Sequence, residues 1–236
     1  MICFLITTYN RKKGLDNLLM SIDNFVDNKV AIVLDDCSDY DVTDVTDQYD
    51  FVRLIRNKIN QGKYYFWKTI TTLYQESKDI DADYFISIQD DKFLLPYTVD
   101  EAVYYWNNIQ DDKKIAMNIF THLNRFGKSA KDVGITPVSA LFENVLVLKN
   151  MWCDHHFICN KKFFEVIDYS IPEIPLLRWK KHPNKPSGVG GKTSKILVNK
   201  GYNIYMAPRN LIGLGNIENS KMNSKMNRPS YAKYRL

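Results

Sequence analysis

The adjacent aspartates Asp90 and Asp91 have the residue type and the position to bind a cation. They follow an apolar, β-prone run at 84–88, which is long enough for one buried strand. Adjacent carboxylates repel each other unless a positive charge lies beside them, and Mg²⁺ or Mn²⁺ bridging a diphosphate is a natural candidate. An Asp-rich turn after a strand is the plain alternative. The pair therefore indicates a metal and phosphate site that needs support from the rest of the chain.

Polar residues also stand at the ends of the first two apolar runs. The run 2–8 leads into polar residues 7–11, and the run 30–34 ends on a second carboxylate pair at 35–36. A nucleotide offers N–H and C=O groups on its base and hydroxyls on its ribose, and carboxylates and backbone groups can bond to both. No G-x-G-x-x-G follows the first run, which excludes the usual dinucleotide-binding loop.

These polar residues need a sheet that gathers the strand ends at one edge. We expect strands at 2–8, 30–34, 51–55 and 84–88, with amphipathic helices at about 12–26 and 62–76. This alternation predicts a parallel βαβ half that extends to about residue 92. Open α/β sheets bind ligands at the carboxyl ends of their strands, where these residues would meet.

The remainder of the chain predicts a second set of elements. A helix carrying Val103, Trp106 and Ile109 is followed by strands and a helix, which we expect at 116–120, 145–148, 161–167 and 203–206. A loop rich in Gly, Ser and Lys spans 125–136, and the segment 152–159 reads as extended. In an extended segment, Asp154 and His156 would share one face.

Composition indicates a folded globule with no membrane span. The chain has 236 residues, 45% of them hydrophobic and 13% aromatic, enough for one large domain or two fused halves. Its four cysteines lack the spacing of a disulfide framework, which suits a reducing cytosol. No apolar run reaches the length of about 18 residues that a span needs, and no signal peptide is evident. We expect a cytoplasmic protein, in the host cytoplasm if the source is a virus.

Charge is distributed unequally along the chain. Residues 177–236 carry thirteen Lys or Arg and one acidic residue, a net charge of +12, whereas the preceding 176 residues carry −7. A basic end of this kind suits a polyanion or an acidic membrane surface, with a solvated tail as the alternative.

A zinc site and a phosphate-binding P-loop are each suggested by a short motif, but neither motif fits its pattern. Cys153, His155, His156 and Cys159 crowd into seven residues, whereas structural zinc prefers two separated ligand pairs. The segment 186–194 is not a phosphate-binding P-loop, because a proline occupies the first glycine position and no strand precedes it.

Four segments in order carry a resemblance to a known fold family. TTYNR at 7–11, LDDCS at 34–38, NQG at 60–62 and QDD at 89–91 resemble the GT-A glycosyltransferases, above all the large inverting family with bacterial and phage members. The match covers the N-terminal half well and the C-terminal half loosely. It implies an α/β fold with a mostly parallel sheet, in which a Rossmann-like nucleotide-sugar half, an acceptor half and a basic tail occupy 1–92, 93–215 and 216–236.

The same resemblance implies a donor site and a metal ligand. Asp91 would hold Mn²⁺ or Mg²⁺, and Gln89 stands where the family has its first acidic residue. The residues that would surround the nucleotide sugar are Thr8, Tyr9, Arg11, Asp36, Asn60, Gly62, Lys63, Gln89 and Asp90, with Lys221 of the tail as a possible phosphate clamp.

The acceptor side departs from the family pattern. A Trp-x-Asp stretch makes Asp154 the candidate catalytic base, although a helix-capping role is equally open. Lys192 and Thr193 follow a Gly-Gly pair where many inverting relatives have an acidic pair, so the base lies elsewhere or the enzyme retains configuration. Leu214 occupies the place of a metal-binding histidine. A third ligand could then be His155, His156 or Asn216.

The resulting hypothesis is metal-dependent transfer of a sugar from a nucleoside-diphosphate sugar, with a UDP-sugar favoured, to an acceptor hydroxyl. The basic end slightly favours a nucleic acid, such as a hydroxymethylated base in phage DNA. Trp179, Tyr231 and Tyr234 stand among its Lys and Arg residues, as stacking on bases and contacts with phosphates would require. A cell-surface polysaccharide or lipid-linked glycan is the alternative, with the tail on acidic headgroups. A nucleotidyltransferase would normally carry a Gly-rich first loop, and an inactive binding module would not need the aspartate pair. The oligomeric state stays open.

Overall fold

The computed structural model of the chain describes residues 1–120, 138–142, 145–149, 152–153, 155–180, 183 and 185–215. The first part alternates strands and helices: β1 (Ile2–Thr8), α1 (Lys12–Phe25), β2 (Lys29–Asp35), α2 (Thr43–Thr46), β3 (Val52–Arg56), α3 (Gly62–Glu76) and β4 (Tyr84–Gln89). The expected strands and helices of this part are confirmed to within about two residues at their ends.

The second part is less regular. It contains β5 (Lys92–Leu94), α4 (Thr98–Asn108), β6 (Lys114–Asn118), β7 (Val138–Phe142), β8 (Val145–Lys149), β9 (Phe157–Cys159), α6 (Lys162–Val166), α7 (Leu177–Lys180), α8 (Val189–Asn199), β10 (Asn203–Met206) and β11 (Ile212–Leu214). The short strands β5, β7 and β11 were not predicted. Strands β5 and β11 have only three residues each, too few to show a periodicity.

One large sheet runs through both parts in the order β3-β2-β1-β4-β9-β6-β10-β8-β7. Strands β3, β2, β1 and β4 are parallel, as the βαβ pattern predicted. Strand β9 lies antiparallel between β4 and β6, and β8 and β7 extend the sheet in antiparallel pairs. Strand β10 is parallel to β6. The parallel character is therefore concentrated in the N-terminal part.

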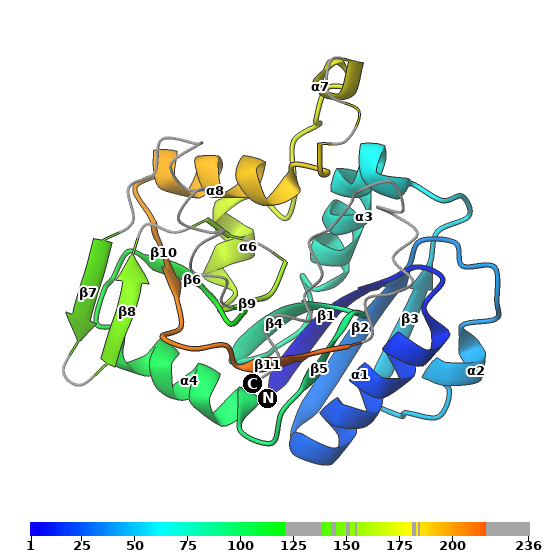
Figure 1. Cartoon of the computed structure of the whole chain (residues 1–236), viewed down its shortest axis with the longest axis horizontal. Coiled ribbons are helices and arrows are strands. Elements are labelled where there is room, and N and C mark those ends of the chain that lie inside the picture. The colour runs from blue at the N-terminus through cyan, green and yellow to red at the C-terminus, as the bar shows by residue number, and fades with distance from the viewer. Residues whose placement is uncertain are drawn as a thin grey trace.

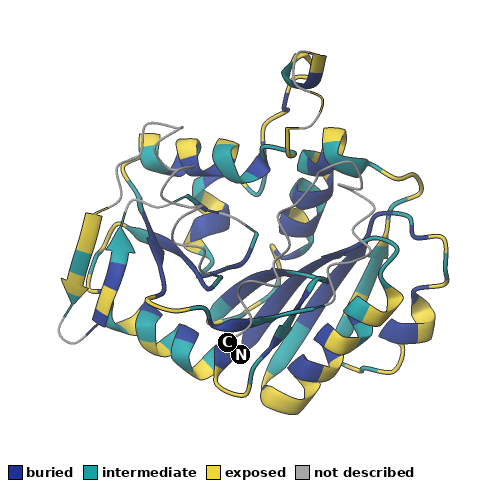
Figure 2. Cartoon of the chain, in the orientation of Figure 1, coloured by how far each residue is buried: buried dark blue, intermediate teal, exposed yellow. Residues whose placement is uncertain are grey.

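The helices cover the sheet on two sides. Figure 1 shows α1 and α4 on one side of the central strands and α3, α6 and α8 on the other. The side chains of Leu15, Leu18, Leu19 and Ile22 recur at helical spacing and are buried against the sheet. All seven residues of β1 are buried, which explains its continuous apolar sequence. Figure 2 shows this buried centre, with exposed residues on the outer helix faces.

A small antiparallel pair, β5 with β11, lies beside α1. Lys92 pairs with Leu214 in this ladder, directly after the Asp90-Asp91 pair. The backbone N–H of Leu94 donates to the hydroxyl of Ser21 on α1 at 2.9 Å. The aspartate pair is thus followed at once by backbone that is fixed in position.

The expectation of one extended segment at 152–159 is wrong for its described part. Only Phe157–Cys159 forms a strand, and His155 and His156 form a bend before it. The ring of His155 contacts Phe66 and the ring of His156 contacts Phe120, with centroids 5.1 and 5.5 Å apart. The two neighbouring rings thus pack on residues from different parts of the chain. Asp154 lies outside the described residues.

Candidate functional site

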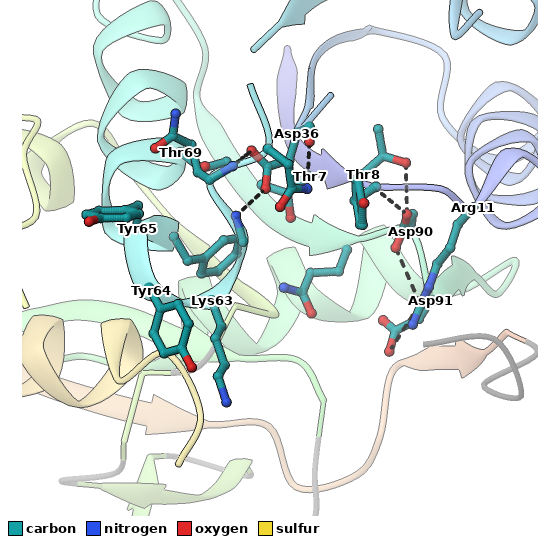
Figure 3. A pocket seen from close by; sticks show the side chains of 16 residues that line it. Thr7, Thr8, Arg11, Asp36, Lys63, Tyr64, Tyr65, Thr69, Asp90 and Asp91 are labelled. Atoms are coloured by element: carbon teal, nitrogen blue, oxygen red, sulfur yellow. Dashed lines mark hydrogen bonds and ion pairs between the residues drawn. The ribbon is translucent and has the colours of Figure 1, made fainter. Parts of the chain in front are cut away.

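The carboxyl ends of β1, β2 and β4 and the start of α3 enclose a pocket of about 560 Å³ (Figure 3). The described residues that the sequence assigned to the donor, and Asp91 as the metal ligand, line it: Thr8, Tyr9, Arg11, Asp36, Asn60, Gly62, Lys63, Gln89, Asp90 and Asp91. His155 and His156, the described candidates for a third metal ligand, are not among the residues that line it. Strand register explains this gathering, since Thr8 pairs with Asp35 and Thr7 pairs with Gln89 at the same sheet edge. Lys221 and Asn216 lie outside the described residues.

Asp90 is buried at the floor of the pocket and is held by the end of β1. One carboxylate oxygen accepts hydrogen bonds from the hydroxyl of Thr8 at 2.8 Å and the backbone N–H of Tyr9 at 3.3 Å. The other oxygen lies 3.4 Å from Nη1 of Arg11. Burial raises the pKa of Asp90 to about 7, although Arg11 and the Thr8 hydroxyl oppose that rise.

Asp91 faces two cations of the chain. Its Oδ1 lies 2.6 Å from Nζ of Lys92, and its Oδ2 lies 3.9 Å from Nη1 of Arg11. Burial alone would raise the pKa of Asp91, but the charges of Lys92, His156 and Arg11 outweigh burial and lower it. Asp91 is therefore the ionised member of the pair at neutral pH.

Asp36 anchors the start of α3. Its two oxygens accept hydrogen bonds of 2.9 Å from the backbone N–H groups of Gln61 and Gly62, and its Oδ1 also accepts from the side chain of Asn57 at 2.8 Å. Gly62 has φ of +53°, a left-handed conformation that favours glycine. The NQG segment is thus shaped so that α3 begins at the pocket wall, with Asp36 at the positive end of its dipole.

The loops after β1 and β2 are tied to each other. The backbone N–H of Asn10 donates to the Ser38 hydroxyl at 2.8 Å, and its side chain exchanges two hydrogen bonds with Asp39. Asn10 and Cys37 both have positive φ, so the two loops turn sharply at their strand ends. Buried Asp35 accepts from the backbone of Ser38 and pairs with Nε of Arg56 at 3.2 Å. These contacts fix the rim that carries Tyr9 and Arg11.

An aromatic wall was missed by the sequence reading. Tyr64, Tyr65 and Phe66 in the first turns of α3 line the pocket, together with Thr7, Gln61 and Thr69. Tyr65 has non-helical φ and ψ, so α3 is kinked where it meets the pocket. The aromatic run at 64–67 was the available signal. Lys92 was also missed, because no sequence pattern marks a lysine as the buried partner of its neighbour.

The Gly190-Gly191 pair at the start of α8 has a packing role. A Cβ added to Gly191 would lie 2.2 Å from the ring of Trp152, and one on Gly190 would lie 2.5 Å from the carbonyl of Cys153. The Ser194 hydroxyl accepts a hydrogen bond of 2.8 Å from the backbone of Cys153. The two glycines therefore allow α8 to pack closely against Trp152 and Cys153.

A basic arm, residues 176–180 and 185–188, lies beyond α3. Its Trp179 is 5% exposed, contacts the ring of Tyr64 at a centroid distance of 5.0 Å, and donates to the carbonyl of Lys185. Trp179 is thus not available to stack on a nucleic-acid base, contrary to the expectation from the sequence. Tyr231, Tyr234 and Arg235 lie outside the described residues.

The fit of a divalent ion depends on the two pocket carboxylates. Across the described residues, no group of three or more His, Cys, Asp or Glu side chains is arranged to hold a metal. Hard carboxylate oxygens suit Mg²⁺ or Mn²⁺, and such ions commonly take the rest of their ligands from water and substrate phosphates. Asp90 and Asp91 fit an ion of that kind.

In the part of the chain that the structure describes, no helix is long and apolar enough to cross a membrane.

Comparisons with known proteins place the chain by its fold. Neither a protein-family profile nor a curated protein sequence matches it. Among solved structures, S. aureus TarS 1-349 is similar with a TM-score of 0.60 and 14% identity, covering 91% of this chain and 60% of TarS 1-349. The mannosyltransferase PcManGT from Pyrobaculum calidifontis, in complex with GDP-Man and Mn²⁺, has a TM-score of 0.58 at 12% identity and covers 89% and 55%.

A third similar structure is glucosyl-3-phosphoglycerate synthase from Mycobacterium tuberculosis in complex with Mn²⁺ and UDP-glucose. Its TM-score is 0.51 at 12% identity, over 85% of this chain and 64% of the synthase. The chain thus spans about three fifths or less of the first structures it matches. With its strand order and its pocket at the strand ends, the chain has the GT-A fold of nucleotide-sugar glycosyltransferases.

Proposed function

We propose that the chain is a metal-dependent glycosyltransferase that takes its sugar from a nucleoside-diphosphate sugar. The single observation that carries this proposal is the pocket itself. Asp90, Asp91 and Arg11 lie in it beside Asp36 and the start of α3, at the carboxyl ends of parallel strands. The mannosyltransferase with GDP-Man and the synthase with UDP-glucose both hold Mn²⁺, which supports the same ligand classes here. A UDP-sugar stays the favoured donor, with a GDP-sugar as the comparison.

The pocket residues divide the work. Arg11 is placed to bind donor phosphate, and Asp90 holds Arg11 in that place. Asp36 keeps the first turn of α3 at the pocket, where its dipole favours an anion. Asp91 and Asp90 would hold the divalent ion, which when bound would offset the charge of the leaving diphosphate. Tyr64 and Tyr65 form an apolar wall for the base or the sugar.

The acceptor half is assigned by the same proposal to residues 93–215, and the donor half to 1–92. Asp154 is the proposed base if the reaction inverts configuration, because a carboxylate can take the proton of an acceptor hydroxyl. Lys221 is the proposed phosphate contact from the tail. Both residues lie outside the described part, so direct mutagenesis has to test them.

The acceptor itself is proposed to be anionic or to lie on an anionic surface. Nucleic acid, including a hydroxymethylated base in phage DNA, is supported by the charge of +12 on residues 177–236. One observation favours the second candidate, a surface or lipid-linked glycan. Leu176 and Leu177 are 47% and 66% exposed on the basic arm, next to Arg178 and Lys180. Apolar side chains beside cations suit an acidic lipid surface.

The test is release of nucleoside diphosphate from a panel of UDP- and GDP-sugars by the full chain. We expect turnover of at least one donor with Mn²⁺ or Mg²⁺ and its loss in EDTA. Binding of nucleoside triphosphates with release of pyrophosphate, and no cleavage of any sugar donor, would support the nucleotidyltransferase alternative instead.

A further inference from the structure

Both aspartates of the pocket already have a cationic partner from the chain itself. Asp90 pairs with Arg11, and Asp91 pairs with Lys92 at 2.6 Å and lies 3.9 Å from Arg11. Two carboxylates therefore face one guanidinium and one ammonium, an equal number of acidic and basic groups. A site built only to attract a free dication would be expected to carry a surplus of negative charge.

Lys92, the ion-pair partner of Asp91, is held in a fixed position. It is 4% exposed, its backbone is paired with Leu214 in the β5–β11 ladder, and its Nζ lies 4.9 Å from the centroid of the Phe120 ring. A buried ammonium cannot turn into water without leaving Asp91 unpaired, and removal of one partner of a buried ion pair is costly. Lys92 does not line the pocket, so it acts on a pocket ligand through Asp91.

We propose that Lys92 makes binding of the divalent ion depend on the donor. In the free protein the balanced cluster has little net attraction for a dication. A nucleoside diphosphate would bring the additional negative charge, so that Asp91 would hold the ion more tightly once the donor is bound. The two ligands should therefore bind cooperatively, each tightening the other by the same factor. This inference depends on the proposed function, since the donor diphosphate is its second ligand.

The experiment measures Mn²⁺ binding by electron paramagnetic resonance of the free ion, without and with saturating UDP. Wild type and all variants are measured in the same buffer at one fixed pH. For the wild-type chain we expect weak Mn²⁺ binding alone and at least about tenfold tighter binding with UDP, within the usual range of coupling.

Lys92→Met removes the charge at similar length. It should tighten Mn²⁺ binding in the absence of UDP and shrink the coupling, whereas Lys92→Arg should keep the coupling. Lys78→Met, at an exposed position of the turn after α3, is the matched control and should behave as wild type. If Lys92→Met does not fold by circular dichroism, Arg11→Met removes the other cation of the cluster from a partly exposed position and has the same expected effect on Mn²⁺ alone.

The outcomes separate this inference from the proposed function. Failure of both UDP and GDP to bind, with or without metal, would overturn the proposed function and the inference with it. Binding of UDP and Mn²⁺ with equal Mn²⁺ affinity in both conditions would overturn the inference alone. So would full coupling in a folded Lys92→Met variant.

Discussion

The carboxylate of Asp36 accepts a 2.9 Å hydrogen bond from the backbone N–H of Gly62, and this contact joins the end of β2 to the first turn of α3. The two residues are 26 positions apart in the sequence. Asp36 therefore acts on the pocket by fixing its wall, in addition to any contact with a ligand. A substitution of Asp36 should therefore affect both the stability of the fold and the binding of a ligand in the pocket.

Asp36→Ala should lower the free energy of unfolding by about 1–3 kcal/mol, because the partly buried N–H groups of Gln61 and Gly62 lose their acceptor. It should also weaken UDP binding. Asp36→Asn keeps an acceptor oxygen and should cost less on both counts. Urea unfolding and calorimetric titration with UDP check this, with exposed Asp50→Ala as the control. Equal effects of the Ala and Asn changes would contradict the anchoring role.

Asp90 predicts a specific pH dependence of stability. Its pKa of about 7 in the folded chain lies above the ordinary value of 3.8, so the folded state binds more protons than the unfolded state between these values. The contribution of Asp90 to stability therefore falls as pH rises from about 4 to about 7, by up to about 1.4 kcal/mol per unit.

Asp90→Asn should remove this dependence. The free energy of unfolding of the variant, minus that of the wild type, should rise with pH across the window and level off above it. Measurements in EDTA keep metal out of the comparison, and Asp50→Asn should give a flat difference. A flat difference for Asp90→Asn would show that its pKa is not raised.

Gly191→Ala tests the contact between α8 and Trp152. The added Cβ would fall 2.2 Å from the indole ring, so the ring or the helix has to move. We expect a loss of about 1–3 kcal/mol in the free energy of unfolding. Lys195→Ala on the exposed side of the same helix should change it by less than about 0.5 kcal/mol. Equal free energies of unfolding for the two variants would show that the Trp152 ring can move away from the added methyl group without loss of stability.

The two acceptor candidates differ in their response to the exposed leucines of the basic arm. Replacing Leu176 and Leu177 with Ser should weaken binding to vesicles of acidic lipid about tenfold or more if the arm inserts there, since a buried Leu contributes about 1.5–3 kcal/mol. Ser at exposed Leu141 and Leu146 is the matched control.

Nucleic acid predicts the opposite pattern. Binding to DNA with hydroxymethylated pyrimidine should survive the leucine changes and fall with salt at a slope of about −0.9 per neutralised phosphate. DNA binding with that slope and no vesicle binding would favour the nucleic-acid candidate. Vesicle binding without a DNA shift at low salt would favour the surface glycan.

The sequence was informative wherever a long element or a strand end was involved. Buried strands such as β1 and β4 can be predicted from their largely apolar sequences. In a parallel sheet the polar residues at the carboxyl ends of these strands lie at the same edge. That is why Thr8, Asp36 and Asp90 could be assigned to one pocket before the fold was known.

The sequence was uninformative where the site depends on contacts between distant segments. The aromatic wall of Tyr64 and Tyr65, the buried position of Trp179 and the partnership of Lys92 with Asp91 arise from packing. A lysine after two aspartates looks like a solvated charge until β5 and β11 bury it. The bend at His155 and the contact of its ring with Phe66, a residue far away in the sequence, were likewise not indicated by any local pattern.

The most direct test of the central claim is donor turnover by Asp91→Ala beside Asp50→Ala, with saturating metal and the best donor of the panel. Asp91 lies in the pocket as the ionised carboxylate, and Asp50 is an exposed aspartate outside it. We predict that Asp91→Ala loses about 10²–10³-fold in kcat, comparable to removal of one group that stabilises developing charge, while its circular dichroism stays that of wild type and Asp50→Ala keeps full activity. Undiminished turnover by a folded Asp91→Ala variant would contradict the account.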